Sequence, residues 1–104
     1  VPTLPTNVYL VGSIQGWNAG SAIEMTRVGD GVFEHTIVIP DGAEFKFLGQ
    51  QDWCGMEWGN IHTGGNSGFL GPNGDNNNIQ YNGGGNTYVI TANIKLGIYK
   101  VTPQ

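Results

Sequence analysis

Charged residues are scarce in this sequence of 104 residues, and basic residues are the scarcest. Lys and Arg together number four against eight Asp and Glu, which gives a formal net charge of −4 at pH 7. There is no run of Lys and Arg that could neutralise phosphates, which argues against a nucleic-acid-binding protein. The same shortage argues against binding to anionic membrane surfaces.

Cysteine is nearly absent, because Cys54 is the only one. A single cysteine excludes a disulfide framework within the chain and a zinc site of the Cys-x-x-Cys type. Apolar runs are short, so the sequence predicts no segment that spans a bilayer. An apolar stripe with helical spacing is also missing, since Gly or Pro interrupts nearly every candidate. We therefore expect no helix longer than one or two turns.

Glycine and aromatic residues are plentiful, with 18 glycines and 11% aromatic side chains. Short blocks of β-branched and aromatic residues alternate with turn signals such as "GDG", "PDG" and "NGGGN". Seven blocks are predicted as strands: Asn7–Val11, Ile23–Val28, Gly31–Ile39, Ala43–Leu48, Asn78–Tyr81, Thr87–Asn93 and Ile98–Thr102. This spacing predicts an all-β fold, a single immunoglobulin-like antiparallel β-sandwich of about seven to eight strands. We expect residues 7–104 to form this domain and residues 1–6 to be a linker from a longer chain.

The predicted strands alternate between apolar and polar residues with a period of two, which is typical of strands buried on one face. Within Ala43–Leu48, Phe45 and Phe47 share one face, whereas Lys46 lies on the other. The alternation predicts a core that contains Phe33, Phe45, Phe47, Ile90 and Tyr99.

Residues 49–77 lack this alternation and are rich in Gly and Asn. The sequence predicts an irregular segment here, and a long irregular segment inside a compact domain is typically functional or disordered. Its two tryptophans, Trp53 and Trp58, argue against disorder.

All three tryptophans, Trp17, Trp53 and Trp58, fall in predicted loops. The stretch "VYLVGSIQGWN", residues 8–18, begins as a strand and ends in turn residues, which places Trp17 just past a strand end. For any one of the three, a role in plugging the end of the sandwich explains the residue as well as a binding role does. Three together favour a stacking platform for sugars, because the apolar face of an indole matches the C–H face of a pyranose.

Polar side chains that suit sugar hydroxyls accompany these rings. Lys46 precedes Trp53 by seven residues, and Asn76, Asn77 and Asn78 precede a predicted strand. Amides and a single ammonium supply donors and acceptors without requiring a charged ligand. Each also has an ordinary explanation, as a solvated surface lysine and as asparagines that form turns.

Three stretches, in this order, resemble the starch- and glycogen-binding β-sandwich modules: "VYLVGSIQGWN", "GDGVFEHTIVIPDGAEFKF" and a following Trp. The closing "NNIQYNGGGNTYVITANIKLGIYKV" is most similar to the repeated domains of the SusE/SusF-type outer-membrane starch-binding proteins of Bacteroidetes. The resemblance covers most of the chain. It implies a non-catalytic carbohydrate-binding module for α-glucans such as starch and maltooligosaccharides, without a cofactor.

The resemblance also implies which residues bind the sugar. Trp17 matches the tryptophan in the first loop of these modules, Lys46 the lysine of the "FKF" strand, and Trp53 the second aromatic residue. An amide from Asn76–Asn78 matches the later amide of the site. The stretch after Trp53 is longer than in the amylase-type modules, and it adds Trp58 as an alternative second ring.

The same resemblance implies an extracellular or cell-surface location, at the outer membrane of a Gram-negative bacterium through a parent protein with other domains. We expect a monomer whose partner is a polysaccharide or oligosaccharide. Neither a nucleic-acid partner nor direct insertion into a membrane is expected.

Catalytic and metal sites find little support in the sequence. Asp52 and Glu57 as a glycosidase pair would need to face each other at roughly 5–10 Å, which a loop containing glycine does not establish. Cys54 with His62 lacks a third group to orient the base. The stretch "NGDNNN" around Asp75 lacks the spaced acids of a calcium loop. We expect neither catalysis nor a bound metal.

Two other functions stay open at this point. The module could bind a different polysaccharide, such as a β-glucan or xyloglucan. It could also be a non-binding spacer, since a fold does not determine a function. A spacer has no reason to expose several tryptophans, so the exposure of these side chains separates the two classes.

Overall fold

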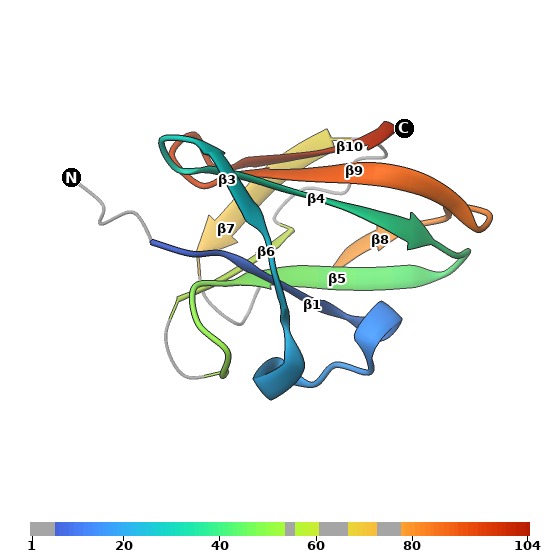
Figure 1. Ribbon diagram of the computed structural model, residues 1–104, viewed down its shortest axis with the longest axis horizontal. Helices are drawn as coiled ribbons and strands as arrows, with labels where there is room; N and C mark the ends of the chain where they lie inside the picture. The colour runs from blue at the N-terminus through green and yellow to red at the C-terminus, as the bar shows by residue number, and fades with distance from the viewer. Residues whose placement is uncertain (1–5, 54–55, 61–66, 73–77) are drawn as a thin grey trace.

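Strands account for most of the regular structure of the protein (Figure 1). The computed structural model describes residues 6–53, 56–60, 67–72 and 78–104, so residues 1–5 of the predicted linker lie outside it. The described ranges contain ten strands: β1 (Tyr9–Gly12), β2 (Ile23–Glu24), β3 (Thr26–Gly29), β4 (Val32–Ile39), β5 (Ala43–Leu48), β6 (Glu57–Asn60), β7 (Ser67–Pro72), β8 (Ile79–Tyr81), β9 (Asn86–Asn93) and β10 (Ile98–Pro103). Two short 3₁₀ helices, η1 (Ser13–Gln15) and η2 (Ala19–Ser21), connect β1 to β2. Within the described ranges, no helix has the length and apolar character needed to cross a membrane.

The strands pair antiparallel in the order β2-β1-β5-β6-β7-β10-β9-β4-β3, with β8 added beside β5. Strand β7 pairs with β10 through Ser67–Phe69 and with β6 through Leu70–Pro72, so it passes from one layer to the other. Strands β2 and β3 are two halves of one bent stretch, and between them the amide of Met25 donates to the carbonyl of Val8 at 2.8 Å. The two layers are therefore connected at one edge by β7 and at the other by the bent stretch of β2 and β3. These connections make the sandwich barrel-like.

The antiparallel sandwich predicted from the sequence is confirmed, but ten strands replace the expected seven to eight. The sequence predicts an irregular stretch over residues 49–77, whereas the structure places β6 and β7 there, so that prediction is wrong for these strands. The two strands are hard to recognise because β6 has four residues and β7 contains Gly68 and Gly71, which interrupt any alternation. The predicted strand Ile23–Val28 is divided into β2 and β3 at the bend.

The main core lies between the two layers. Five residues predicted as core are almost fully buried in it, with exposed fractions of 0–1%: Phe33, Phe45, Phe47, Ile90 and Tyr99. The rings of Phe45 and Phe47 pack edge to face with centroids 6.0 Å apart. His35 lies on the same face of β4 as Phe33, and desolvation there lowers the pKa of its imidazole. These residues confirm the face assignments made from the alternation.

A second, smaller apolar cluster covers the opposite face of β1 and β5. Its buried members are Val11, Ala19, Ala22 and Leu48, and Tyr9 and Trp17 pack against them. The segment that carries η1 and η2 supplies Ala19 and Ala22, so this segment lies over the outer face of the sheet. Strand β5 is consequently covered on both faces.

Gly12 ends β1 at a point where the backbone of β5 comes very close. A Cβ at this position would lie 2.7 Å from the Cβ of Phe45 and would also meet the carbonyl oxygen of Glu44. Its φ of 178° is ordinary extended backbone that any residue adopts. Glycine is therefore required here because a Cβ would collide with β5, and not because of the backbone conformation.

Replacing Gly12 by Ala should lower the free energy of unfolding by about 1–3 kcal/mol, because the added methyl forces β1 and β5 apart. Gly29→Ala is the matched control, since a Cβ there lies 3.6 Å from the side chain of Val32, an ordinary contact. Urea denaturation of both variants measures the difference. Equal unfolding midpoints for Gly12→Ala and Gly29→Ala would contradict the close approach.

Candidate functional site

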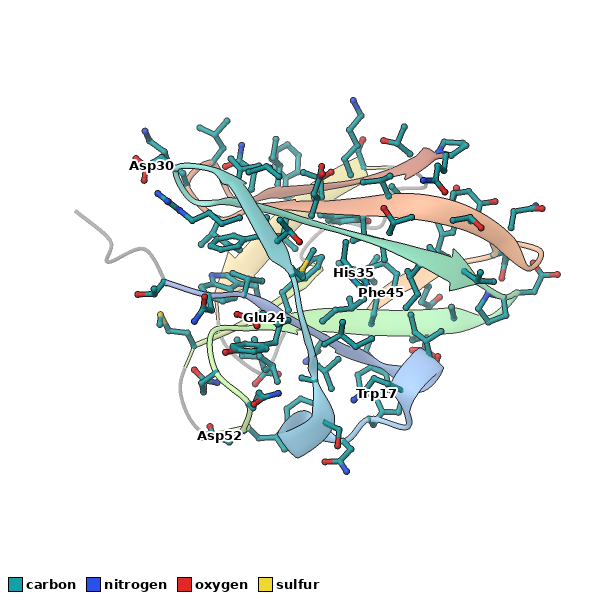
Figure 2. The ribbon with its side chains drawn as sticks, in the orientation of Figure 1. Trp17, Glu24, Asp30, His35, Phe45 and Asp52 are labelled. Atoms are coloured by element: carbon teal, nitrogen blue, oxygen red, sulfur yellow. The ribbon has the colours of Figure 1, made fainter. Side chains whose placement is uncertain are left out.

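Trp17 lies in the loop after β1, on the side of the sheet opposite Phe45 (Figure 2). Gly16 (φ 80°) and Trp17 (φ 59°) both adopt the left-handed conformation. For a bulky side chain this backbone costs on the order of 1–3 kcal/mol. The amide of Trp17 donates to the carbonyl of Gly12 at 2.9 Å, which closes the turn. The loop thus holds a half-buried indole against the second cluster.

Trp53 lies in the loop that follows β5, and its side chain is 45% exposed. The centroid of its ring is 6.5 Å from that of Trp17, and the two ring planes are inclined by 31°. The loops that carry the two rings are joined, because the side-chain amide of Gln51 donates to the carbonyl of Ala22 at 3.0 Å. Two of the tryptophans singled out in the sequence therefore form one tilted aromatic pair at the surface.

Trp58 is not part of this pair. It lies on β6 opposite Phe47 of β5, and it packs, half-buried, against the main core. Its neighbour Glu57 faces the other side of the sheet, where it contacts Lys46. The structure therefore brings Trp53 and not Trp58 to Trp17.

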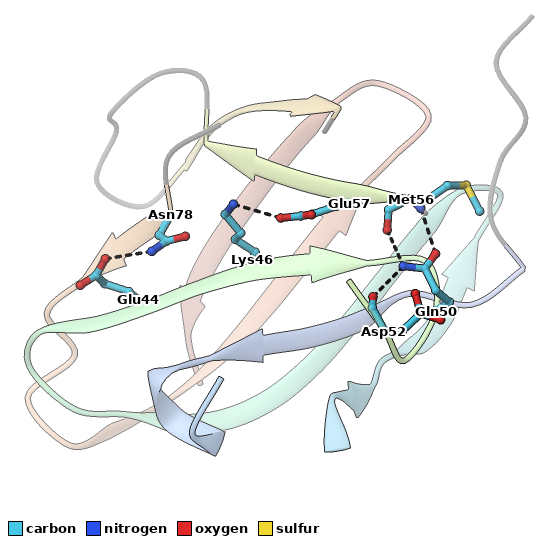
Figure 3. Close-up of polar contacts among 7 residues, drawn as sticks. All are labelled: Glu44, Lys46, Gln50, Asp52, Met56, Glu57 and Asn78. Atoms are coloured by element: carbon cyan, nitrogen blue, oxygen red, sulfur yellow. Dashed lines mark hydrogen bonds and ion pairs between the residues drawn. The ribbon is translucent and has the colours of Figure 1, made fainter. Parts of the chain in front are cut away.

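Lys46 lies on the face of β5 opposite the main core, as the alternation predicts, but it is not a solvated surface lysine. Only 7% of the residue is exposed. Its Nζ lies 3.1 Å from Oε1 of Glu57, and both side chains are about nine-tenths buried (Figure 3). Taking two charges out of water is costly, so such a pair is held only where its geometry is good. The explanation of Lys46 as an ordinary exposed lysine is wrong.

Asn78 comes directly before β8, beside the same face of β5. Its side-chain amide donates to Oε1 of Glu44 at 3.2 Å (Figure 3). Glu44 is two residues from Lys46 on β5, so the polar groups of Asn78, Glu44, Lys46 and Glu57 follow one another along this strand. The other two asparagines of the predicted set, Asn76 and Asn77, lie outside the described residues.

Sequence reasoning missed the groups that support these side chains. The sequence suggests Glu57 only as a catalytic carboxylate, and no signal links it to Lys46, which is eleven residues away. The glutamines Gln15, Gln50 and Gln51 were also missed. Here a signal exists, because "QGW" and "QQDW" place glutamine shortly before each ring of the pair.

The carboxylates weighed as a glycosidase pair have different surroundings. Asp52 is exposed in the loop after β5, whereas Glu57 is buried and paired with Lys46. Cys54, His62 and Asp75, considered for nucleophilic or metal chemistry, lie outside the described residues. In the part of the chain that the structure describes, no three His, Cys, Asp or Glu side chains come together as a metal site.

Comparison with known protein families gives one result. The family model described as "SusF, first starch specific CBM", where CBM stands for carbohydrate-binding module, matches residues 4–103. This match spans nearly the whole chain. No curated protein and no solved structure matches the sequence.

Replacing Lys46 by Met should destabilise the fold by about 3–5 kcal/mol, because it leaves the buried carboxylate of Glu57 without the ammonium. Glu57→Gln should cost less, since an amide oxygen still accepts a hydrogen bond from that ammonium. Chemical denaturation measures both variants. The double variant Lys46→Met/Glu57→Gln is the control, and it should recover part of the loss. A Lys46→Met variant as stable as the wild type would contradict a structural role for this ion pair.

Proposed function

Because the chain belongs to the family of first starch-specific carbohydrate-binding modules of SusF, we propose that its tilted Trp17–Trp53 pair binds an α-1,4-glucan chain. The pair is the observation that carries this proposal. When a sugar stacks on an exposed indole, the apolar face of the indole and the C–H face of the sugar are both removed from water, which favours binding. The indole breaks few contacts with the protein in doing so. Two rings at a centroid distance of 6.5 Å offer such a surface to neighbouring sugars of one chain.

The inclination of the rings supports a curved ligand. An α-1,4-glucan winds into a helix, so successive sugars turn away from a common plane. Rings inclined by 31° follow that turn, whereas a flat chain such as cellulose favours coplanar rings. The placement of Trp58 against the main core supports Trp53 as the second ring.

The polar part of the proposed site is Lys46 with an amide from Asn76–Asn78. Of these asparagines, Asn78 is the one that lies within the described residues, and it adjoins the row of polar groups along β5. The ion pair with Glu57 fixes the direction of the Lys46 ammonium. A donor with a fixed direction selects among sugar hydroxyls better than a flexible surface lysine does.

We further propose that the module is part of a cell-surface protein, at the outer membrane of a Gram-negative bacterium, and that it works there as a monomer. The family match supports the carbohydrate partner. The surface location follows from the resemblance to SusE/SusF-type proteins. Labelling of intact cells with an antibody against the domain tests that location.

Trp53→Ala should weaken the binding of maltoheptaose by on the order of 2 kcal/mol, roughly 30-fold, as expected for a central aromatic contact. Because the residue is 45% exposed, the free energy of unfolding should fall by about 1 kcal/mol or less. Trp17→Ala should weaken binding as much and should also lower stability, since Trp17 packs against the second cluster. Isothermal titration calorimetry and urea denaturation measure the two effects.

Leu96→Ala is the control for this series, because Leu96 is 68% exposed in the turn before β10. It should bind like the wild type. A folded Trp53→Ala variant that binds maltoheptaose as tightly as the wild type would show that the pair is not the site. Tighter binding of cellohexaose or xyloglucan oligosaccharides would favour the alternative ligand class, and binding of none of these sugars would favour a spacer.

The domain should bind amylose without cleaving it, because no acid–base pair or activated nucleophile is placed beside the rings among the described residues. Prolonged incubation of amylose with the pure domain should release no reducing sugar above the buffer control. Release that disappears in Asp52→Asn or Glu57→Gln would overturn this expectation.

A further inference from the structure

The side chain of Gln15 forms hydrogen bonds with the backbone before and after Trp17. Its side-chain oxygen accepts hydrogen bonds from the amides of Asn18 (3.0 Å) and Gly12 (3.3 Å). Its side-chain nitrogen donates to the carbonyl of Asn18 at 2.8 Å. The amide of this one glutamine therefore ties the residue after the ring to the end of β1.

Gln50 makes the same kind of contact in the other loop. Its side-chain oxygen accepts from the amide of Met56 at 2.9 Å, and its nitrogen donates to the carbonyls of Met56 (3.1 Å) and Asp52 (2.9 Å) (Figure 3). The amide of Gly49 also donates to the carbonyl of Met56 at 2.8 Å. The ends of the loop that carries Trp53 are thereby held together.

We propose that Gln15 and Gln50 are positioning residues, which act through the backbone to hold Trp17 and Trp53 in the arrangement that binds the glucan. This inference rests on the proposed function of the ring pair. In both loops a glutamine amide pairs with the N–H and the C=O of a single residue, as a strand neighbour would. Only a side chain that both donates and accepts can do this.

Each loop needs such a support for a different reason. Trp17 adopts a left-handed backbone that a bulky residue otherwise avoids, so the turn must be held from outside. Trp53 is 45% exposed and is not among the residues packed against either apolar cluster, so its loop must be held by other contacts. Rings that are already in place bind a ligand more tightly, because binding then has less conformational freedom to remove.

Gln51 completes the arrangement by joining the two loops. Its amide donates to the carbonyl of Ala22, and Ala22 belongs to the cluster on which Trp17 packs. The position of one ring is therefore linked to that of the other. The distance and the inclination of the pair then depend on backbone contacts that no sugar needs to touch.

The test uses Gln15→Met and Gln50→Met, which keep the size of the side chain and remove its hydrogen bonds. Exposed Gln104, after β10, supplies the control Gln104→Met. The first readout is the circular dichroism couplet that two close indoles produce without any ligand, assigned to the pair by its loss in Trp53→Ala. The second is the affinity for maltoheptaose, and the third is the melting temperature.

Gln15→Met and Gln50→Met, called the clamp variants below, should each reduce the couplet and weaken maltoheptaose binding by on the order of tenfold, because affinity falls with the fraction of molecules in the binding arrangement. Gln104→Met should change neither. If both clamp variants are folded and keep the couplet, or lose the couplet and bind as tightly as the wild type, the proposal is wrong. A lower melting temperature with an unchanged couplet would indicate a merely structural role and would also overturn it.

A Gln50→Glu variant keeps the proposal testable if the Met variant fails to fold. At neutral pH the introduced carboxylate cannot donate to the carbonyls of Met56 and Asp52, so the couplet should be weak. The protonated acid has one O–H and can donate to one of the two carbonyls, so part of the couplet should recover as the pH falls through the pKa of this carboxyl, at or above the usual value of about 4.3. The wild type at the same pH is the control, and a couplet that does not depend on pH in the variant would contradict the proposed role of Gln50.

The couplet needs no sugar, so it separates this inference from the proposed function. A wild type that does not bind maltoheptaose refutes the proposed function. The couplets of the Gln15→Met and Gln50→Met variants then still decide whether these residues hold the rings.

Discussion

The burial of strand β5 on both faces is the constraint on which the rest of the structure depends. Phe45 and Phe47 face the main core, whereas Leu48 faces the second cluster beneath η1 and η2. An antiparallel sheet can leave one face to solvent, so the second cover is not required by the sandwich itself. Its consequence is that the loop with Trp17 is packed down as part of the fold, close to the end of the strand that leads to Trp53. The packing of the η1–η2 segment on β5 therefore also places the surface that carries the two rings.

The face of β5 opposite the main core also carries the buried ion pair of Lys46 and Glu57. Only 7% of Lys46 is exposed, and an unpaired ammonium buried to this extent would be strongly disfavoured. Glu57 reaches it from β6, because β6 pairs with the end of β5 and directs Glu57 and Trp58 to opposite faces. One pairing register thus places a carboxylate beside the lysine and a tryptophan in the core. It also explains why Trp58 does not join the exposed pair.

The sequence predicted the regular strands well because their alternation is clean. The bounds of β5 agree with the predicted strand, and those of β4, β9 and β10 differ by one residue. Strands β6 and β7 could not be predicted, because neither has a clear alternation of apolar and polar residues. They form because they pair with β5 and with each other. For the site, Trp17 and Trp53 were named as candidates, but their contact depends on a left-handed turn and on hydrogen bonds between loops. The burial of Lys46 could not be foreseen either, because its partner Glu57 lies on β6, a strand that the sequence pattern does not reveal.

The two rings of the pair differ in how they are held, and this difference bears on how a platform of this kind works. Trp17 packs against a buried cluster and sits in a strained turn, so its orientation is fixed by the fold. Trp53 is exposed, and its place is set by the hydrogen bonds of its loop. Trp17 therefore gives the pair a fixed reference surface, and the hydrogen bonds of Gln50 and Gln51 set the position of the second loop against it. The distance and the inclination of the two rings thus result from one packed loop and one hydrogen-bonded loop, and neither loop alone determines them.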